Sequence, residues 1–242
     1  TPMLSALRRV AAFCLCLALC FGLAGLVATA WLALRGRLVL MRQSARVYAF
    51  GILGLFGFHF FYFTAIRNAP PVDANLINYT WPLLIVVFSA LLPGERLKLQ
   101  HVVGTLLGLG GAALLILRGD GLALDGDATP GYLAAVASAL FWSGYSLLSR
   151  RFQAVPTSIV TWFCAATAIL SALCHVGLEE TVWPVSTGEW LNVLGLGLMP
   201  VGAAFYAWDY GVKRGNIQVL GAASYAAPLL STLILIAAGA AE

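Results

Sequence analysis

The sequence predicts an all-α polytopic membrane protein, and three observations carry that prediction. Hydrophobic residues make up 61% of the 242 residues and charged residues only 10%, whereas about a quarter of the residues of a soluble domain are charged. The mean hydropathy is +0.89. Apolar windows of roughly 20 residues, the length that a helix needs to cross a bilayer, follow one another along the chain. The net charge of +4 therefore does not indicate a nucleic-acid partner, and we expect none.

Eight apolar windows lie between clusters of charge, glycine or proline. They cover residues 10–34, 47–66, 74–93, 101–118, 130–149, 157–177, 188–211 and 216–239. Short connectors such as GERLKLQ and RRFQAVP separate them, so no soluble domain fits between them. Membrane-barrel strands are only ~10 residues long and polar on one side, so we expect a helical bundle. In the first window, which contains Gly22 and Gly25, a break into two pieces is a further alternative.

Basic residues are concentrated in alternate connectors, and this distribution predicts the orientation. One set of loops holds ten of the 14 basic residues, namely Arg35, Arg37, Arg42, Arg46, Arg96, Lys98, Arg150, Arg151, Lys213 and Arg214. The positive-inside rule assigns these loops to the cytoplasm. Both ends of the chain then fall on the outer side, which is unusual for an inner-membrane protein. We expect that a helix is missing or disrupted at each end.

Cysteine and histidine residues show no pattern of metal ligands. The five cysteines lie inside apolar windows, and the three histidines are scattered. Free cysteines in such positions usually act as small hydrophobic residues. We therefore expect no metal, no disulfide framework and no cofactor.

An internal repeat links the third and eighth windows. NYTWPLL at 78–84 matches SYAAPLL at 224–230, and each follows a segment that contains Phe-Tyr. The charge distribution has the two copies entering the membrane from opposite faces. Inverted repeats of this kind are typical of secondary transporters, whose substrate sites lie near the midplane. The alternative is a chance match, since proline is unremarkable in a membrane helix.

These residues resemble the drug/metabolite transporter superfamily and its EamA-type members. The resemblance rests on Asn78-Tyr79-x-Trp81-Pro82-Leu83-Leu84, on the Gly94-Glu95 that follows, and on the glycine-rich stretch at 104–111. The segments 131–152 and 204–231 are similar to bacterial YddG-type exporters of aromatic amino acids. The resemblance implies a ten-helix fold made of two inverted five-helix repeats. About eight helices are evident here, in a first repeat at 1–119, which lacks its first helix or has it disrupted, and a second repeat at 128–242, which lacks its last.

Proline and aromatic residues on these helices are candidates for the transport site. Pro82 and Pro228 each remove a backbone donor, so we expect hinges there that free a carbonyl near Asn78 or Ser224. A structural kink alone is the alternative. Aromatic rings can stack on an apolar side chain and attract an ammonium group. The expected substrate-binding residues are Tyr62, Asn78, Tyr79, Trp81, Trp142, Tyr206, Trp208, Ser224 and Tyr225.

Two titratable residues inside the windows are candidate proton or ammonium sites. Asp209 is costly in a membrane and is therefore a functional candidate by default, although it lies close enough to Lys213 and Arg214 to pair with them. His59 is a candidate proton relay, with a packing histidine as the favoured alternative. The glycine run contains Gly-x-x-x-Gly, which indicates close helix packing within the bundle or across a dimer, so a monomer and a homodimer both stay open.

The resemblance implies a multi-pass transporter of the bacterial inner membrane that exports aromatic and other hydrophobic amino acids by alternating access through an aromatic-lined cavity. An exporter of another small metabolite or drug is one alternative. An intramembrane enzyme is the other, but it would need a cluster of titratable residues, and the windows offer only Asp209 and His59. We therefore do not expect an enzyme.

Overall fold

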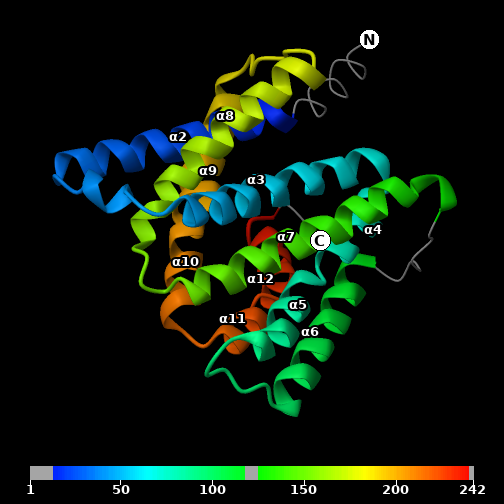
Figure 1. Cartoon of the computed structure of the whole chain (residues 1–242). Helices are drawn as coiled ribbons and strands as arrows, with labels where there is room; N and C mark the ends of the chain where they lie inside the picture. The colour runs from blue at the N-terminus through cyan, green and yellow to red at the C-terminus, as the bar shows by residue number, and fades with distance from the viewer. Residues whose placement is uncertain (1–12, 118–124, 240–242) are drawn as a thin grey trace, which may run out of the picture. The chain divides into compact units, whose positions relative to one another are not determined.

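The computed structural model describes residues 13–117 and 125–239, and within these ranges every regular element is helical (Figure 1). The α-helices are α2 Phe13–Leu34, α3 Ala45–Asn68, α4 Pro71–Asn78, α5 Trp81–Phe88, α6 Leu99–Leu117, α7 Thr129–Arg151, α8 Val160–Leu178, α9 Thr187–Leu198, α10 Ala204–Arg214, α11 Ile217–Ala223 and α12 Ala226–Ala237. Eight segments of the described chain are long and apolar enough to cross a membrane. They coincide with the eight predicted windows, which confirms the helical membrane fold.

Helix continuity differs from the expectation in two places. The first window forms one unbroken helix from Phe13 to Leu34, so no break occurs there; residues 10–12 of that window lie outside the described residues. The seventh window is not one regular helix, because a π-helical turn, η5 Met199–Ala203, separates α9 from α10. Pro200 lies in this turn, and its ring and missing N–H disturb the regular α-helical pattern. The apolar window at 188–211 gave no expectation of a break there.

The chain forms two compact units. Unit 1 contains residues 13–60 and 152–210, and unit 2 contains residues 61–117, 125–151 and 211–239 of the described chain. In unit 1, α2 packs along α8 and also contacts α9. The close approach of α2 to α8 requires a glycine, because a Cβ on Gly25 would lie 3.2 Å from the backbone nitrogen of Ala165. The Glu179 carboxylate, just past the end of α8, accepts hydrogen bonds from the backbone N–H groups of Cys14 and Leu15.

Unit 2 is built around two interrupted helices. The α4–α5 pair packs against α7, and α11 lies against α5 and α6, while α12 contacts α6 (Figure 1). Small residues permit these contacts. A Cβ on Gly221 of α11 would lie 3.0 Å from Val86 and 3.2 Å from the carbonyl oxygen of Pro82. The two interrupted helices therefore touch close to Pro82.

Gly108 of α6 faces the Tyr225 ring, and this contact predicts a difference between neighbouring glycines. A methyl group on Gly108 would lie 2.7 Å from Cδ2 of Tyr225, whereas one on Gly110 meets open space. We expect Gly108→Ala to lower the free energy of unfolding by about 1–3 kcal/mol, as overpacking does. Gly110→Ala serves as the matched control and leaves stability unchanged or slightly raised. Thermal unfolding in detergent measures both, and equal stability of the two variants would contradict the packing described here.

Candidate functional site

The predicted site residues divide between the two units. Unit 2 holds Tyr62, Asn78, Tyr79, Trp81, Pro82, Trp142, Ser224, Tyr225 and Pro228. Unit 1 holds His59, Tyr206, Trp208 and Asp209. The larger group gathers where α4 gives way to α5 and where α11 gives way to α12.

Both proline-containing helices are interrupted two to four residues before the proline. Tyr79 and Thr80 separate α4 from α5, and Ser224 and Tyr225 separate α11 from α12. Neither proline can donate to the carbonyl four residues back. At the second break the Ser224 carbonyl accepts from the Ala227 N–H instead, at 3.1 Å. That carbonyl is therefore satisfied within its own helix and is not freed as expected.

A hydrogen bond joins the two breaks directly. The hydroxyl of Tyr225, in the second break, donates to the carbonyl oxygen of Tyr79, in the first, at 2.9 Å. The Tyr225 side chain is buried, with 6% exposed. A backbone carbonyl released by one interrupted helix is thus satisfied by a side chain from the other, which is the kind of compensation that broken membrane helices need. The two repeated motifs meet at this contact.

Asn78 ends α4 as a buried amide. Its side chain is 5% exposed, and its Oδ1 accepts a hydrogen bond from the Ser138 hydroxyl of α7 at 2.9 Å. One turn earlier, Oδ1 of Asn75 accepts from the Tyr62 hydroxyl. These two bonds tie the polar end of α4 to α7 and to the last part of α3.

Aromatic rings cover the apolar side of the same region. The Trp81 and Trp142 rings meet edge to face with centroids 6.2 Å apart, and the Trp142 ring stacks on Tyr145 at 5.3 Å. Trp142 is 6% exposed. The three rings come from α5 and α7, beside the first helix break. They supply a flat, polarisable surface of the kind that favours aromatic and cationic groups.

The predicted site residues of unit 1 have different surroundings. The Tyr206 hydroxyl shares a hydrogen bond with Thr161 at 2.8 Å, and Tyr206 lines a groove of about 340 Å³ together with residues of α2 and the π-helical turn. Asp209 is fully buried. Trp208 is half-buried.

His59 has the surroundings of a packing histidine, the alternative that the sequence favoured. Its Nδ1 bonds to the Leu55 carbonyl at 2.7 Å, and the rings of Phe21, Phe58 and Phe205 surround it with centroids 4.8–5.7 Å away. A role of His59 or Asp209 in proton transfer stays a prediction.

Sequence reasoning missed Ser138 and gave Gly221 no role. Ser138, Ser146 and Ser149 are buried hydroxyl residues on α7. The serines that recur in the segment 131–152 are the sequence signal that could have indicated them. Gly221 has no motif of its own. Only the approach of α11 to the Pro82 carbonyl shows why a side chain is excluded there.

The sequence matches the family model of the EamA-like transporter family twice, over residues 3–117 and over residues 129–238. The chain belongs to this family. Its members are transporters, so the chain is a transporter of a small molecule and not an enzyme. With eight membrane-length helices, it is a multi-pass protein of the bacterial inner membrane.

Two relatives of this EamA-like chain are named as aromatic amino acid exporters. It is 55% identical over 224 residues to the aromatic amino acid exporter YddG of Ancylobacter novellus, a match that covers 92% of this chain and 78% of the relative. It is 25% identical over 169 residues to the aromatic amino acid exporter YddG of Salmonella typhimurium, covering 67% of this chain and 57% of that one. A solved crystal structure, 53% identical, matches with a TM-score of 0.89 over 95% of this chain and 80% of the other.

The Ser138–Asn78 bond predicts that two buried serines on α7 differ in importance. Ser138→Ala leaves the buried Asn78 oxygen without this donor, and we expect a loss of about 1–3 kcal/mol in the free energy of unfolding. Ser143 is equally buried but its hydroxyl bonds only to carbonyls of its own helix, those of Ala139 and Leu140. Ser143→Ala should therefore be near neutral. Thermal unfolding of the two variants in detergent measures the difference. A larger loss of stability in Ser143→Ala than in Ser138→Ala would contradict the role given to the Ser138–Asn78 hydrogen bond.

Proposed function

We propose that this transporter exports aromatic and other hydrophobic amino acids across the inner membrane by alternating access. The observation that carries the proposal is the pairing of two interrupted helices, joined by the Tyr225–Tyr79 hydrogen bond, beside a cluster of aromatic rings. The names of the relatives from Ancylobacter novellus and Salmonella typhimurium support the same substrate class.

The first helix break suits a zwitterion. The end of α4 presents carbonyl oxygens with partial negative charge, and the start of α5 presents the positive end of a helix dipole. Half-helices of this kind hold the charged groups of substrates in other secondary transporters. In our proposal the α-ammonium lies toward Asn78 and the Tyr79 carbonyl, and the α-carboxylate lies toward the start of α5. Tyr225 competes for the same carbonyl and would release it when the substrate binds.

The side chain of the amino acid would lie on the aromatic cluster. Trp81 and Trp142 meet edge to face, so an inserted ring can replace one partner of that contact at little cost. Stacking and apolar burial then favour phenylalanine and tryptophan over small amino acids. We propose Tyr62 as a further substrate-binding residue of unit 2, and Pro82 and Pro228 as the hinges of the moving helices. Tyr206 and Trp208 of unit 1 stay candidate substrate-binding residues.

Transport by purified protein tests the proposal through Trp142. In liposomes, we expect saturable uptake of radiolabelled phenylalanine, tryptophan, methionine and threonine. Trp142→Ala should raise KM for tryptophan roughly tenfold, the equivalent of a lost ring contact of about 1.4 kcal/mol. Trp190→Ala removes a ring that is 41% exposed and serves as the control with unchanged KM. If wild type takes up none of the four amino acids, a different metabolite is the substrate.

An imposed proton gradient separates two versions of the mechanism. If Asp209 or His59 carries a proton during the cycle, the gradient drives accumulation of substrate above equilibrium. If both are structural, uptake only equilibrates and ignores the gradient. The packed surroundings of His59 lead us to expect the second result, and accumulation that collapses in Asp209→Asn would overturn it.

A further inference from the structure

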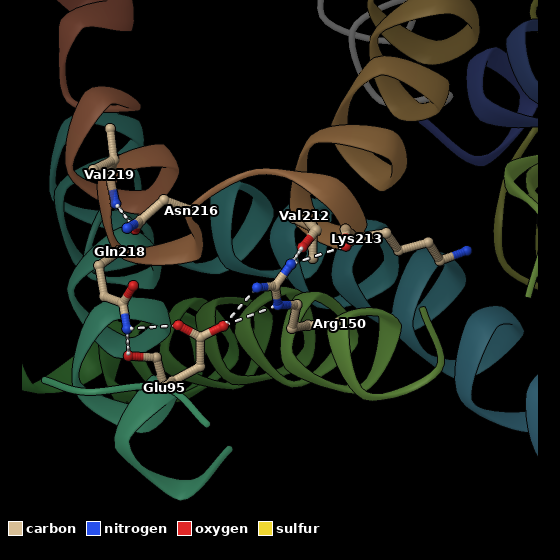
Figure 2. Close-up of polar contacts among 8 residues, drawn as sticks. Glu95, Arg150, Val212, Lys213, Asn216, Gln218 and Val219 are labelled. Atoms are coloured by element: carbon tan, nitrogen blue, oxygen red, sulfur yellow. Dashed lines mark hydrogen bonds and ion pairs between the residues drawn. The ribbon is translucent and has the colours of Figure 1, made fainter. Parts of the chain in front are cut away.

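A compact polar node in unit 2 joins Glu95, Arg150 and Gln218 (Figure 2). The Arg150 guanidinium, in the last turn of α7, donates from Nε and Nη2 to one oxygen of Glu95 at 3.0 and 2.7 Å. The other Glu95 oxygen accepts from the Gln218 side chain at 3.2 Å. The same amide nitrogen of Gln218 also lies 3.1 Å from the Ser89 hydroxyl. Both oxygens of the carboxylate are therefore used.

The node also holds the connector between α10 and α11. Nη1 of Arg150 donates to the carbonyl oxygens of Val212 and Lys213 at 3.2 and 2.9 Å. These carbonyls end α10, where the last turn leaves acceptors without partners inside the helix. The helix α11 begins after Asn216, whose side-chain oxygen accepts a hydrogen bond from the Val219 N–H. Gln218, in the first turn of α11, donates to the Glu95 carboxylate (Figure 2). One arginine and one glutamate thus fix the connector at both sides.

The position of the node along the chain points to a conformational role. The chain leaves unit 2 after Arg151 and re-enters it at Gly211. Arg150 and its two carbonyl partners lie within two residues of these crossings, so a single guanidinium fastens both crossings into unit 2. A movement that pulls on either segment has to strain these charge-assisted hydrogen bonds first.

The two ends of α7 are held very differently. At its last turn the helix has the four hydrogen bonds of Arg150, two of which form the ion pair with Glu95. At its first turn the Tyr132 hydroxyl accepts one hydrogen bond from the backbone N–H of Asp125 at 3.1 Å and reaches the Asp73 carboxylate at 3.5 Å, the limit of a hydrogen bond. The strong contacts thus lie at the end that the positive-inside rule assigns to the cytoplasm.

The node also reaches the candidate site through α11. This helix is seven residues long, from Ile217 to Ala223. Gln218, which is 2% exposed, anchors its start to Glu95, and Tyr225 anchors its far end to the Tyr79 carbonyl. A helix this short moves as one piece, so release at one end changes the strain at the other.

We propose that Glu95, Arg150 and Gln218 form a latch on the cytoplasmic side that is closed in this structure and opens once in each transport cycle. Closed, it holds the α10–α11 connector and keeps α11 in the position where Tyr225 meets Tyr79. Open, it frees α11 to move. The opening step rests on the proposed function, whereas the holding of the connector does not.

Hydrogen exchange of the purified full chain in nanodiscs tests the holding role without any substrate. Arg150→Gln and the isosteric Glu95→Gln should speed amide exchange in 211–223 by about 5- to 100-fold, the range of a typical coupling between sites. Exchange in α2 and α8 of unit 1 should stay as in wild type. The control is Arg151→Gln, an exposed neighbour. Exchange in 211–223 that is the same in Arg150→Gln, Glu95→Gln and Arg151→Gln overturns the proposal.

A reversible crosslink tests the opening. Glu95→Cys with Gln218→Cys, bridged by a short dithiol-specific reagent, should stop transport, and reductant should restore it; each single cysteine variant with the same reagent is the control. Undiminished transport by the bridged protein overturns the proposed opening and shows that the contact between Glu95 and Gln218 stays closed throughout the cycle. If wild type moves none of the amino acids offered, the proposed function fails, and the exchange experiment decides the holding role by itself.

Discussion

A bilayer offers no water to backbone groups, so every carbonyl and N–H that leaves a helical ladder in the membrane needs a partner from the protein. The helices can be interrupted at Tyr79–Thr80 and Ser224–Tyr225 because backbone groups released there find partners within the protein. The hydroxyl of Tyr225 supplies the Tyr79 carbonyl, and Ala227 supplies that of Ser224. Gly108 and Gly221 provide the space that these contacts need. The hydrogen bonds of the polar groups inside the membrane therefore depend on the small residues around them.

That constraint also explains why three polar pairs near the predicted site residues are hydrogen-bonded to each other. Asn78 is paired with Ser138, Tyr62 with Asn75, and Tyr206 with Thr161. Each set joins two different helices. A substrate that enters such a region exchanges one hydrogen bond for another, and the net free-energy change stays small enough for binding and release.

The fold was predictable from the sequence because a membrane span needs a long apolar stretch, and length is a property of one segment alone. The breaks near Pro82 and Pro228 were predictable for the same reason, since proline acts within its own helix. Pro200 has the same chemistry, but it lies in a window without a repeated motif and was overlooked. The partners of the site residues were beyond local reasoning. Nothing near Tyr225 in the sequence indicates a carbonyl 146 residues away, and Ser138 gains its meaning only from the place where α4 ends.

The division of the chain has a consequence for how the protein is made. Unit 1 needs residues up to 210, and unit 2 uses residues from 61 to 151 together with those after 210. Ribosomes deliver the chain in order, so the helices between 61 and 151 enter the membrane before unit 1 has received α8 and α9. Neither unit can be completed by the first half of the polypeptide alone. During insertion the Tyr79 carbonyl therefore lacks the Tyr225 hydroxyl until the last third of the chain arrives.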